Sequence, residues 1–171
     1  MSLLRAKVFT KDSYGEEALR ILFSRLRSLG IINAHIDVKP APGLCNAKLS
    51  RVIRASCMEF NRVILLIDGD GHPEEARRRQ EQHLPKEPEL RRRAAIITNT
   101  YEIEEWLLHA LYNEEPRGTK PSDRLRELTN GWYQKKHLPK LMEKTLSREE
   151  TLNRLLQHPT VKKLVENLGN P

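Results

Sequence analysis

The run Val63-Ile64-Leu65-Leu66-Ile67-Asp68-Gly69-Asp70 decides the fold class of this chain. Its first five residues are apolar without a break, which is typical of a strand that is buried on both faces. Strands of this kind belong to parallel sheets that helices cover. We therefore expect Asp68 and Asp70 at the carboxyl end of a central strand, where open parallel sheets bind their ligands.

Outward from this strand, apolar strand-like runs alternate with amphipathic helical stretches through the first two-thirds of the chain. Further strands are expected over residues 3–10, 31–38 and 94–98. Helices are expected over residues 13–28, 46–60, 74–83 and 102–111. This alternation predicts an α/β fold with about four mainly parallel strands in residues 1–115.

The pattern changes after Pro116-Arg117-Gly118, because no strand signal recurs beyond it. Short helices are predicted over residues 123–128, 138–144, 147–157 and 160–168. We interpret residues 116–171 as a helical appendage to the α/β domain.

The charge balance points to an anionic partner. The 171 residues include 30 Lys and Arg against 23 Asp and Glu, which gives a formal net charge of +7. Such an excess favours nucleic acid, either DNA or RNA, although many unrelated basic proteins share it. A second copy of the chain or another protein stays open as a further partner.

The composition also bears on the compartment. No apolar run approaches the roughly 20 residues that a bilayer span needs, so we expect no membrane association. The first residues lack the features of a secretory signal peptide. Cys45 and Cys57 are too few for a disulfide framework and lack the spacing of a zinc site, so both are expected to be reduced. These features predict a cytoplasmic protein.

The loop after the central strand is the strongest candidate for chemistry. Asp68 and Asp70 would direct two carboxylates toward nearly the same point, and Gly69 and Gly71 would let the backbone turn while leaving room for an ion or a phosphate. Two like charges so close together need a cation, and oxygen ligands favour Mg²⁺ or Mn²⁺. The alternative is an ordinary Asp-Gly turn at a strand end.

Two further groups of acids follow other strands at the same edge. Glu104 and Glu102 open the helix after the fourth strand, and Glu104 is the candidate third metal ligand. Both could instead stabilise the helix N-terminus, with Glu102 closing a capping box with Asn99 and Glu105 in solvent.

After the first strand, Asp12 and Glu16 are the candidate catalytic acids. Ser13 and Glu16 have the spacing of a capping box, which would commit Glu16 to the helix.

Basic clusters could attract a phosphate backbone. They comprise Lys48, Arg51 and Arg54 on the second helix, Arg77-Arg78-Arg79 on the third, and Arg91-Arg92-Arg93 before the fourth strand. From these, Lys48, Arg51, Arg77, Arg78 and Arg92 are the expected nucleic-acid contacts. Solvated basic faces are the alternative. Trp132 and Tyr133 with Lys135-Lys136 could stack a base or form a local core.

These residues resemble a known family. The stretch Ile67-Asp68-Gly69-Asp70, with Glu102-Ile103-Glu104-Glu105-Trp106-Leu107-Leu108 downstream, is similar to the TOPRIM superfamily, and most of all to small stand-alone toprim-like proteins related to OLD-family nucleases. The resemblance spans roughly residues 3–113 in its order of elements. It implies a Rossmann-like TOPRIM fold for this part of the chain.

The resemblance also implies roles for single residues. The acid after the first strand, Asp12 or Glu16, would act as the general acid/base, and Asp12 has the position that the family uses. The Asp68–Asp70 pair would bind Mg²⁺ for phosphodiester chemistry. The family's usual Glu-Gly pair after the first strand is absent here.

The leading hypothesis is therefore a Mg²⁺-dependent toprim-type nuclease that acts on DNA or RNA. A non-catalytic toprim-like nucleic-acid-binding protein is the second hypothesis, because the first-strand motif departs from the family pattern. A small-molecule phosphatase with Asp68 as nucleophile and Asp70 as acid/base is a third.

Overall fold

The computed structural model describes residues 3–43 and 47–169 of the chain. Its strands are β1 (Leu4–Thr10), β2 (Ala34–Pro40), β3 (Arg62–Ile67) and β4 (Ala94–Thr98). The helices that follow β1, β2 and β3 are α1 (Ser13–Ser28), α2 (Ala47–Glu59), α3 (Pro73–Glu81) and α4 (Pro88–Arg91). Those after β4 are α5 (Glu104–Tyr112), α6 (Pro121–Leu128), the short 3₁₀ helix η1 (Lys135–His137), α7 (Leu138–Leu146), α8 (Glu149–Gln157) and α9 (Pro159–Leu168).

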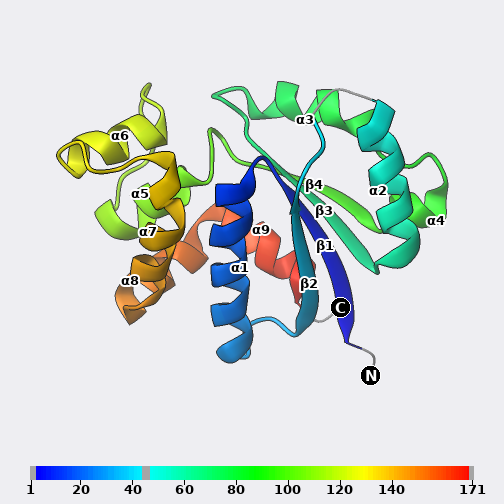
Figure 1. Cartoon of the computed structure of the whole chain (residues 1–171), viewed down its shortest axis with the longest axis horizontal. Coiled ribbons are helices and arrows are strands. Elements are labelled where there is room, and N and C mark those ends of the chain that lie inside the picture. Colours follow the sequence, from blue (N-terminus) through cyan, green and yellow to red (C-terminus); the bar gives the residue numbers. More distant parts are fainter. Residues whose placement is uncertain (1–2, 44–46, 170–171) are drawn as a thin grey trace.

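The strands form one parallel sheet in the order β2-β1-β3-β4. Residues Val8, Ile64 and Ala95 lie side by side in this register. With helices between the strands, the arrangement is a Rossmann-like α/β fold, as predicted (Figure 1). The predicted second helix begins at Asn46, which lies outside the described residues, so α2 is described from Ala47.

β3 is a central strand, because it lies between β1 and β4, and its side chains are buried on both faces of the sheet. Ile64 and Leu66 point into one hydrophobic cluster, and Val63, Leu65 and Ile67 point into the other. The alternation follows from the two-residue repeat of a strand. α1 and α9 cover the first face, while α2 covers the second (Figure 1). The unbroken apolar run at residues 63–67 is explained by this double burial.

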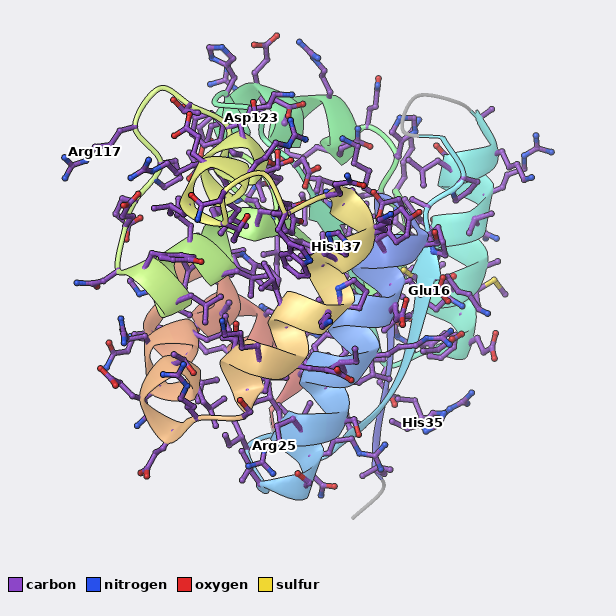
Figure 2. The ribbon with its side chains drawn as sticks, turned by 60° about the vertical axis from the view of Figure 1, so that its left-hand side comes forward. Glu16, Arg25, His35, Arg117, Asp123 and His137 are labelled. Atoms are coloured by element: carbon purple, nitrogen blue, oxygen red, sulfur yellow. The ribbon has the colours of Figure 1, made fainter. Side chains whose placement is uncertain are left out.

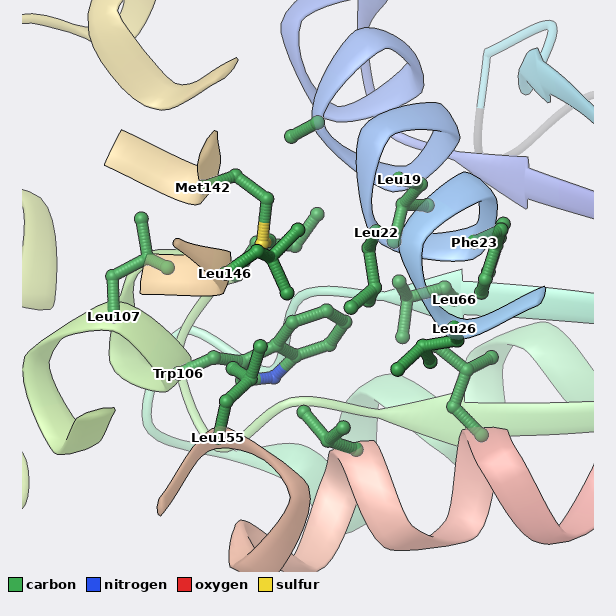
Figure 3. Close-up of a cluster of buried hydrophobic side chains, with 14 of the residues drawn as sticks. Leu19, Leu22, Phe23, Leu26, Leu66, Trp106, Leu107, Met142, Leu146 and Leu155 are labelled. Carbon is green, nitrogen blue, oxygen red and sulfur yellow. The ribbon is translucent and has the colours of Figure 1, made fainter. Parts of the chain in front are cut away.

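The C-terminal helices share their core with the sheet. Trp106 on α5 is fully buried, and Figure 3 shows its indole between Leu22 of α1, Leu146 of α7 and Leu155 of α8. All four side chains belong to one cluster with Ile64 and Leu66 of β3. After residue 116 the chain forms helices and no further strands within the described residues. The hydrophobic core nevertheless continues across this point, because residues from both parts belong to one cluster.

The described residues also bear on the expectations about membrane association and about the two cysteines. Within residues 3–43 and 47–169, no helix is both long and apolar enough to cross a membrane. Cys57 is a free, buried thiol on α2. Cys45 lies outside the described residues.

Candidate functional site

Three strand ends meet at one edge of the sheet. β1, β3 and β4 are parallel neighbours, so the residues that follow Thr10, Ile67 and Thr98 converge at their carboxyl ends. The Nζ atom of Lys11, after β1, lies 3.4 Å from Oδ2 of Asp68, after β3. The fold thus joins two of the predicted loops at one place.

Asp68 is largely withdrawn from water at this edge. Its side chain is 11% exposed. Burial raises the pKa of Asp68 to about 6; Lys11 and Lys135 oppose this shift, while Glu104 and Glu102 add to it. A carboxyl group with such a pKa exchanges its proton near neutrality, and carboxyl groups of this kind are frequent in functional sites.

Glu104 is the most deeply buried acid of the site. It is the first residue of α5, and its side chain is fully shielded from solvent. The Tyr133 hydroxyl and the Lys135 ammonium both donate to Oε1, at 2.9 and 2.8 Å. Its Oε2 atom is also buried but has no hydrogen-bond partner among the described residues. Burial raises the pKa of Glu104, and Glu102 raises it further against the effect of Lys135.

The cation at this site comes from the C-terminal part of the chain. Lys135 is the first residue of η1, 31 residues after Glu104 in sequence. Burial lowers the pKa of the Lys135 ammonium, but Glu104, Glu102 and Asp12 outweigh that effect and the net shift is upward. Burial and Glu104 raise the pKa of Tyr133, which keeps its hydroxyl protonated as a donor. We did not predict Tyr133 or Lys135 as ligands of Glu104, because neither lies near a strand end.

We call Asp12, Asp68, Glu102 and Glu104 the acidic cluster. Glu104, Glu102 and Asp12 each raise the pKa of Lys135, and Lys135 in turn lowers the pKa of Asp68. The four carboxyl groups face two ammonium groups, those of Lys11 and Lys135. When the four carboxyl groups and the two ammonium groups are all ionised, their formal charges sum to −2.

Asp70 occupies a different position from Asp68. It is exposed and has a positive φ of 46°, a conformation that Asp and Asn tolerate better than most residues. Asp70 and Asp68 nevertheless line the same pocket of about 220 Å³, together with His72 and Arg79. The two aspartates of the predicted pair thus share a pocket and differ sharply in burial.

Gly69 serves loop packing. A Cβ atom at this position would lie 2.4 Å from the backbone oxygen of Asn99 and 2.6 Å from that of Thr100. The amide of Gly71 donates to the oxygen of Thr100 at 2.8 Å. The space beside Gly69, which we expected to be left for an ion or phosphate, is filled by the loop after β4.

Glu102 and Glu105 hold neighbouring backbone. Oε1 of Glu102 accepts from the amide of Ser122 at 2.9 Å, in the first turn of α6. The two oxygens of Glu105 accept from the amides of Thr100 and Tyr101, at 3.0 and 2.8 Å. The alternative in which Glu105 lies in solvent is excluded, since this residue is 1% exposed. Burial raises the pKa of Glu105 to about 7, against the two amides.

The expected capping box does not close with Asn99 either. Oδ1 of Asn99 accepts from the indole nitrogen of Trp106 at 2.7 Å. Glu102 instead contacts α6.

The capping box that Ser13 and Glu16 could have formed at α1 is absent. Asp12 is the N-cap, and its Oδ1 accepts from the amide of Gly15 at 2.8 Å. Ser13 is already helical, and the carboxylate of Glu16, which Figure 2 labels, pairs with Arg20 at 2.7 Å instead. An aspartate directly before a helix is a preferred N-cap, so the local signal pointed to Asp12 rather than Ser13.

The predicted basic contacts divide between the two edges of the sheet. Lys48 and Arg51 are exposed in the first half of α2, which starts at the carboxyl edge. Arg77 and Arg78 are exposed on α3, which follows the Asp68 loop. Arg92 is exposed just before β4, and so lies at the opposite, amino edge. The structure therefore does not bring Arg92 to the acidic cluster.

Neither the structure nor the comparison with known proteins identifies a ligand or a family for this site. Within the described ranges 3–43 and 47–169, no three Asp, Glu, His or Cys side chains gather in a way that would hold a metal ion. The sequence matches no family model, and no curated protein and no solved structure is significantly similar to it.

Proposed function

We propose that this chain is a metal-dependent nuclease of the toprim type that cleaves phosphodiester bonds of DNA or RNA. One observation supports the proposal most directly: the fully buried Glu104 has an oxygen without a partner among the described residues, and it is close enough to Asp68 to raise the pKa of that carboxyl. A buried carboxylate oxygen without a partner costs free energy, and a bound cation would remove that cost.

Mg²⁺ or Mn²⁺ fits the donors that are present. Mg²⁺ in proteins is commonly bound through one or two carboxylates, with water and phosphate oxygens as its other ligands. Asp68 and Glu104 are the residues that we propose to hold it. Asp70 shares a pocket with Asp68 that Glu104 does not line, and the described residues do not gather the three acids into one metal site. Every donor is an oxygen, which favours these hard ions. The bound ion would neutralise phosphate charge and lower the pKa of a bound water.

The protein's own groups have distinct roles in this proposal. The ammonium groups of Lys11 and Lys135 attract the phosphate and stabilise negative charge on its oxygens. Asp12 keeps the role of proton acceptor; its helix cap uses Oδ1, so Oδ2 is the atom that takes the proton. Glu16 is a weaker candidate, because Arg20 pairs with its carboxylate.

Binding without cleavage is the second candidate. It is favoured by the cap contact of Asp12, which commits one carboxylate oxygen to α1. A phosphatase with Asp68 as nucleophile is weaker, because a nucleophile must be accessible and this side chain is mostly buried. The buried free thiol of Cys57 is compatible with the cytoplasm as the proposed location.

The test is cleavage of labelled single- and double-stranded DNA and RNA with Mg²⁺, Mn²⁺ or EDTA. We expect metal-dependent cleavage that Asp68→Asn and Glu104→Gln each reduce at least roughly 100-fold. Glu149→Gln is the matched control, since Glu149 is an exposed acid on α8, and it should cleave like the wild type. Nucleic-acid binding without cleavage under any condition would favour the second candidate.

A further inference from the structure

Trp132 exposes an aromatic surface in the segment that leads to the acidic cluster. The chain has two tryptophans. Trp106 is fully buried, whereas Trp132 is 41% exposed. Apolar surface in contact with water is unfavourable, and a flat ligand that covered the indole would remove part of that cost. Such a surface beside a proposed phosphate site suggests a role in binding the same molecule.

The indole is held in a defined orientation. The ring of His137 stacks on it, with the two centroids 4.2 Å apart and the planes 9° from parallel. His137 lies at the amino end of α7 (Figure 2). The Nζ atom of Lys140 lies 5.7 Å from the centre of the Trp132 ring. We call Trp132, His137 and Lys140 the Trp132 platform.

The platform borders an open groove. The groove has a volume of about 600 Å³ and includes Tyr112, Leu141 and Lys144 in its lining. It therefore combines aromatic and aliphatic surface with two exposed lysines, Lys140 and Lys144, and one exposed acid, Glu143, so its charged side chains sum to +1. Aromatic rings interleaved with basic side chains are the usual composition of surfaces that bind unpaired nucleotides.

The same short segment reaches the acidic cluster. Tyr133 and Lys135 donate to Glu104, while Trp132 and His137 stack outside. Residues 132–137 thus connect the platform directly to the proposed phosphate site. A strand whose phosphate lies at Lys135 would then place a neighbouring nucleotide at Trp132, three residues earlier in the chain.

We propose that the Trp132 platform stacks an unpaired base of a single-stranded nucleic acid, which makes single strands the preferred substrate class. The inference rests on the proposed function for the position of the phosphate. In a duplex, both faces of an internal base are covered by its neighbours, so only an unpaired base offers a face to the indole. Lys140 and Lys144 then supply charge for the adjoining phosphates.

The test measures binding in EDTA, where metal-dependent cleavage cannot interfere. The probes are an oligothymidylate of about 12 nucleotides, within the usual range of site sizes, and a duplex of the same length. Because Trp106 is buried, we expect the single strand to quench the fluorescence of Trp132 and the duplex to quench it much less. Trp132→Ala should weaken single-strand binding by roughly 5- to 150-fold and change duplex binding little.

Two variants serve as controls. Trp132→Phe keeps an aromatic face and should recover most of the single-strand affinity. Met58→Ala removes an exposed apolar side chain on α2, away from the platform, and should bind like the wild type. Equal single-strand affinity of Trp132→Ala and the wild type would overturn the proposal. Concentration-dependent dimerisation that Trp132→Ala abolishes would also overturn it, since the groove would then be a protein interface.

The outcomes separate this inference from the proposed function. Metal-dependent cleavage with no effect of Trp132→Ala on single-strand binding refutes the platform and leaves the nuclease standing. Quenching by single strands with no cleavage under any metal condition refutes the nuclease and supports the platform.

Discussion

Replacing Asp68 with asparagine should stabilise the metal-free protein at neutral pH. The substitution keeps the shape of the side chain and removes a charge that is mostly shielded from water. Burial raises the pKa of Asp68 from 3.8 to about 6. A shift of that size corresponds to about 3 kcal/mol of destabilisation by the ionised carboxylate at pH 7. This value already includes the attraction of Lys11, and it is an upper value because water screens the part of the side chain that remains exposed.

The expected gain is therefore smaller than this upper value, at about 1 to 2 kcal/mol. For a chain of this length, each kcal/mol moves the melting temperature by roughly 2 to 4 °C. We expect Asp68→Asn to melt roughly 2 to 8 °C above the wild type at pH 7 in EDTA.

The sign of the pH dependence follows from the raised pKa. Protonated Asp68 is compatible with burial, so its contribution to stability is fully present below about pH 4 and is lost as the pH rises through about 6. The difference in melting temperature between Asp68→Asn and the wild type should therefore be small at pH 4 and grow toward pH 7. Added Mg²⁺ should reduce the difference at pH 7, because only the wild type retains the full proposed site.

Thermal unfolding followed by circular dichroism at several pH values is the measurement. Asp70→Asn is the matched control, since Asp70 is exposed and asparagine tolerates its positive φ equally well. Its stability should stay within about 0.5 kcal/mol of the wild type. A lower melting temperature for Asp68→Asn than for the wild type at pH 7, or a difference that does not vary with pH, would refute the reasoning.

Three further predictions concern the loop, the buried ion pair and the basic surface. Gly69→Ala should destabilise the fold by about 1 to 3 kcal/mol in urea unfolding, because its Cβ would meet backbone that cannot move aside; wild-type stability would contradict this. Lys135→Met should lower the melting temperature at pH 7, because it leaves the buried Glu104 carboxylate without its ion-pair partner. Adding Glu104→Gln removes that charge and should restore much of the lost stability. If the effects of the two substitutions simply add, the two residues are not a coupled pair. Lys48→Ala should reduce the salt dependence of oligonucleotide binding measured by fluorescence anisotropy, whereas Arg92→Ala at the opposite edge should not, and equal effects would show that both edges bind.

Much of the fold could be predicted from local patterns. β4 spans the predicted residues 94–98, and the four short C-terminal helices lie within about three residues of the predicted ranges. The reason is that side-chain periodicity reflects which face of an element meets the core, and this information is local. The parallel sheet followed from the alternation of strands and helices for the same reason.

The candidate site could be predicted only in part. Asp68 was found because it ends the most apolar strand, and strand ends converge in a parallel sheet. The cap of α1 was assigned to the wrong residues: Asp12 caps the helix, and Glu16 pairs with Arg20. Two overlapping capping patterns compete at the start of α1, and only the backbone decides between them. The space beside Gly69 was misjudged, because the loop that fills it comes from another strand.

The sequence by itself determined the four strands, the longer helices, their alternation and the strand-end position of Asp68, but not the short helices α4 and η1. The tertiary structure decided which groups meet there: Tyr133 and Lys135 reach Glu104 from the segment between α6 and α7, and Trp106 joins the C-terminal helices to the sheet. Periodicity states which face of a helix is apolar, but it does not state which other helix that face will meet. Contacts between distant segments depend on how the whole chain packs, so a buried glutamate and its lysine 31 residues later become partners only in the folded state.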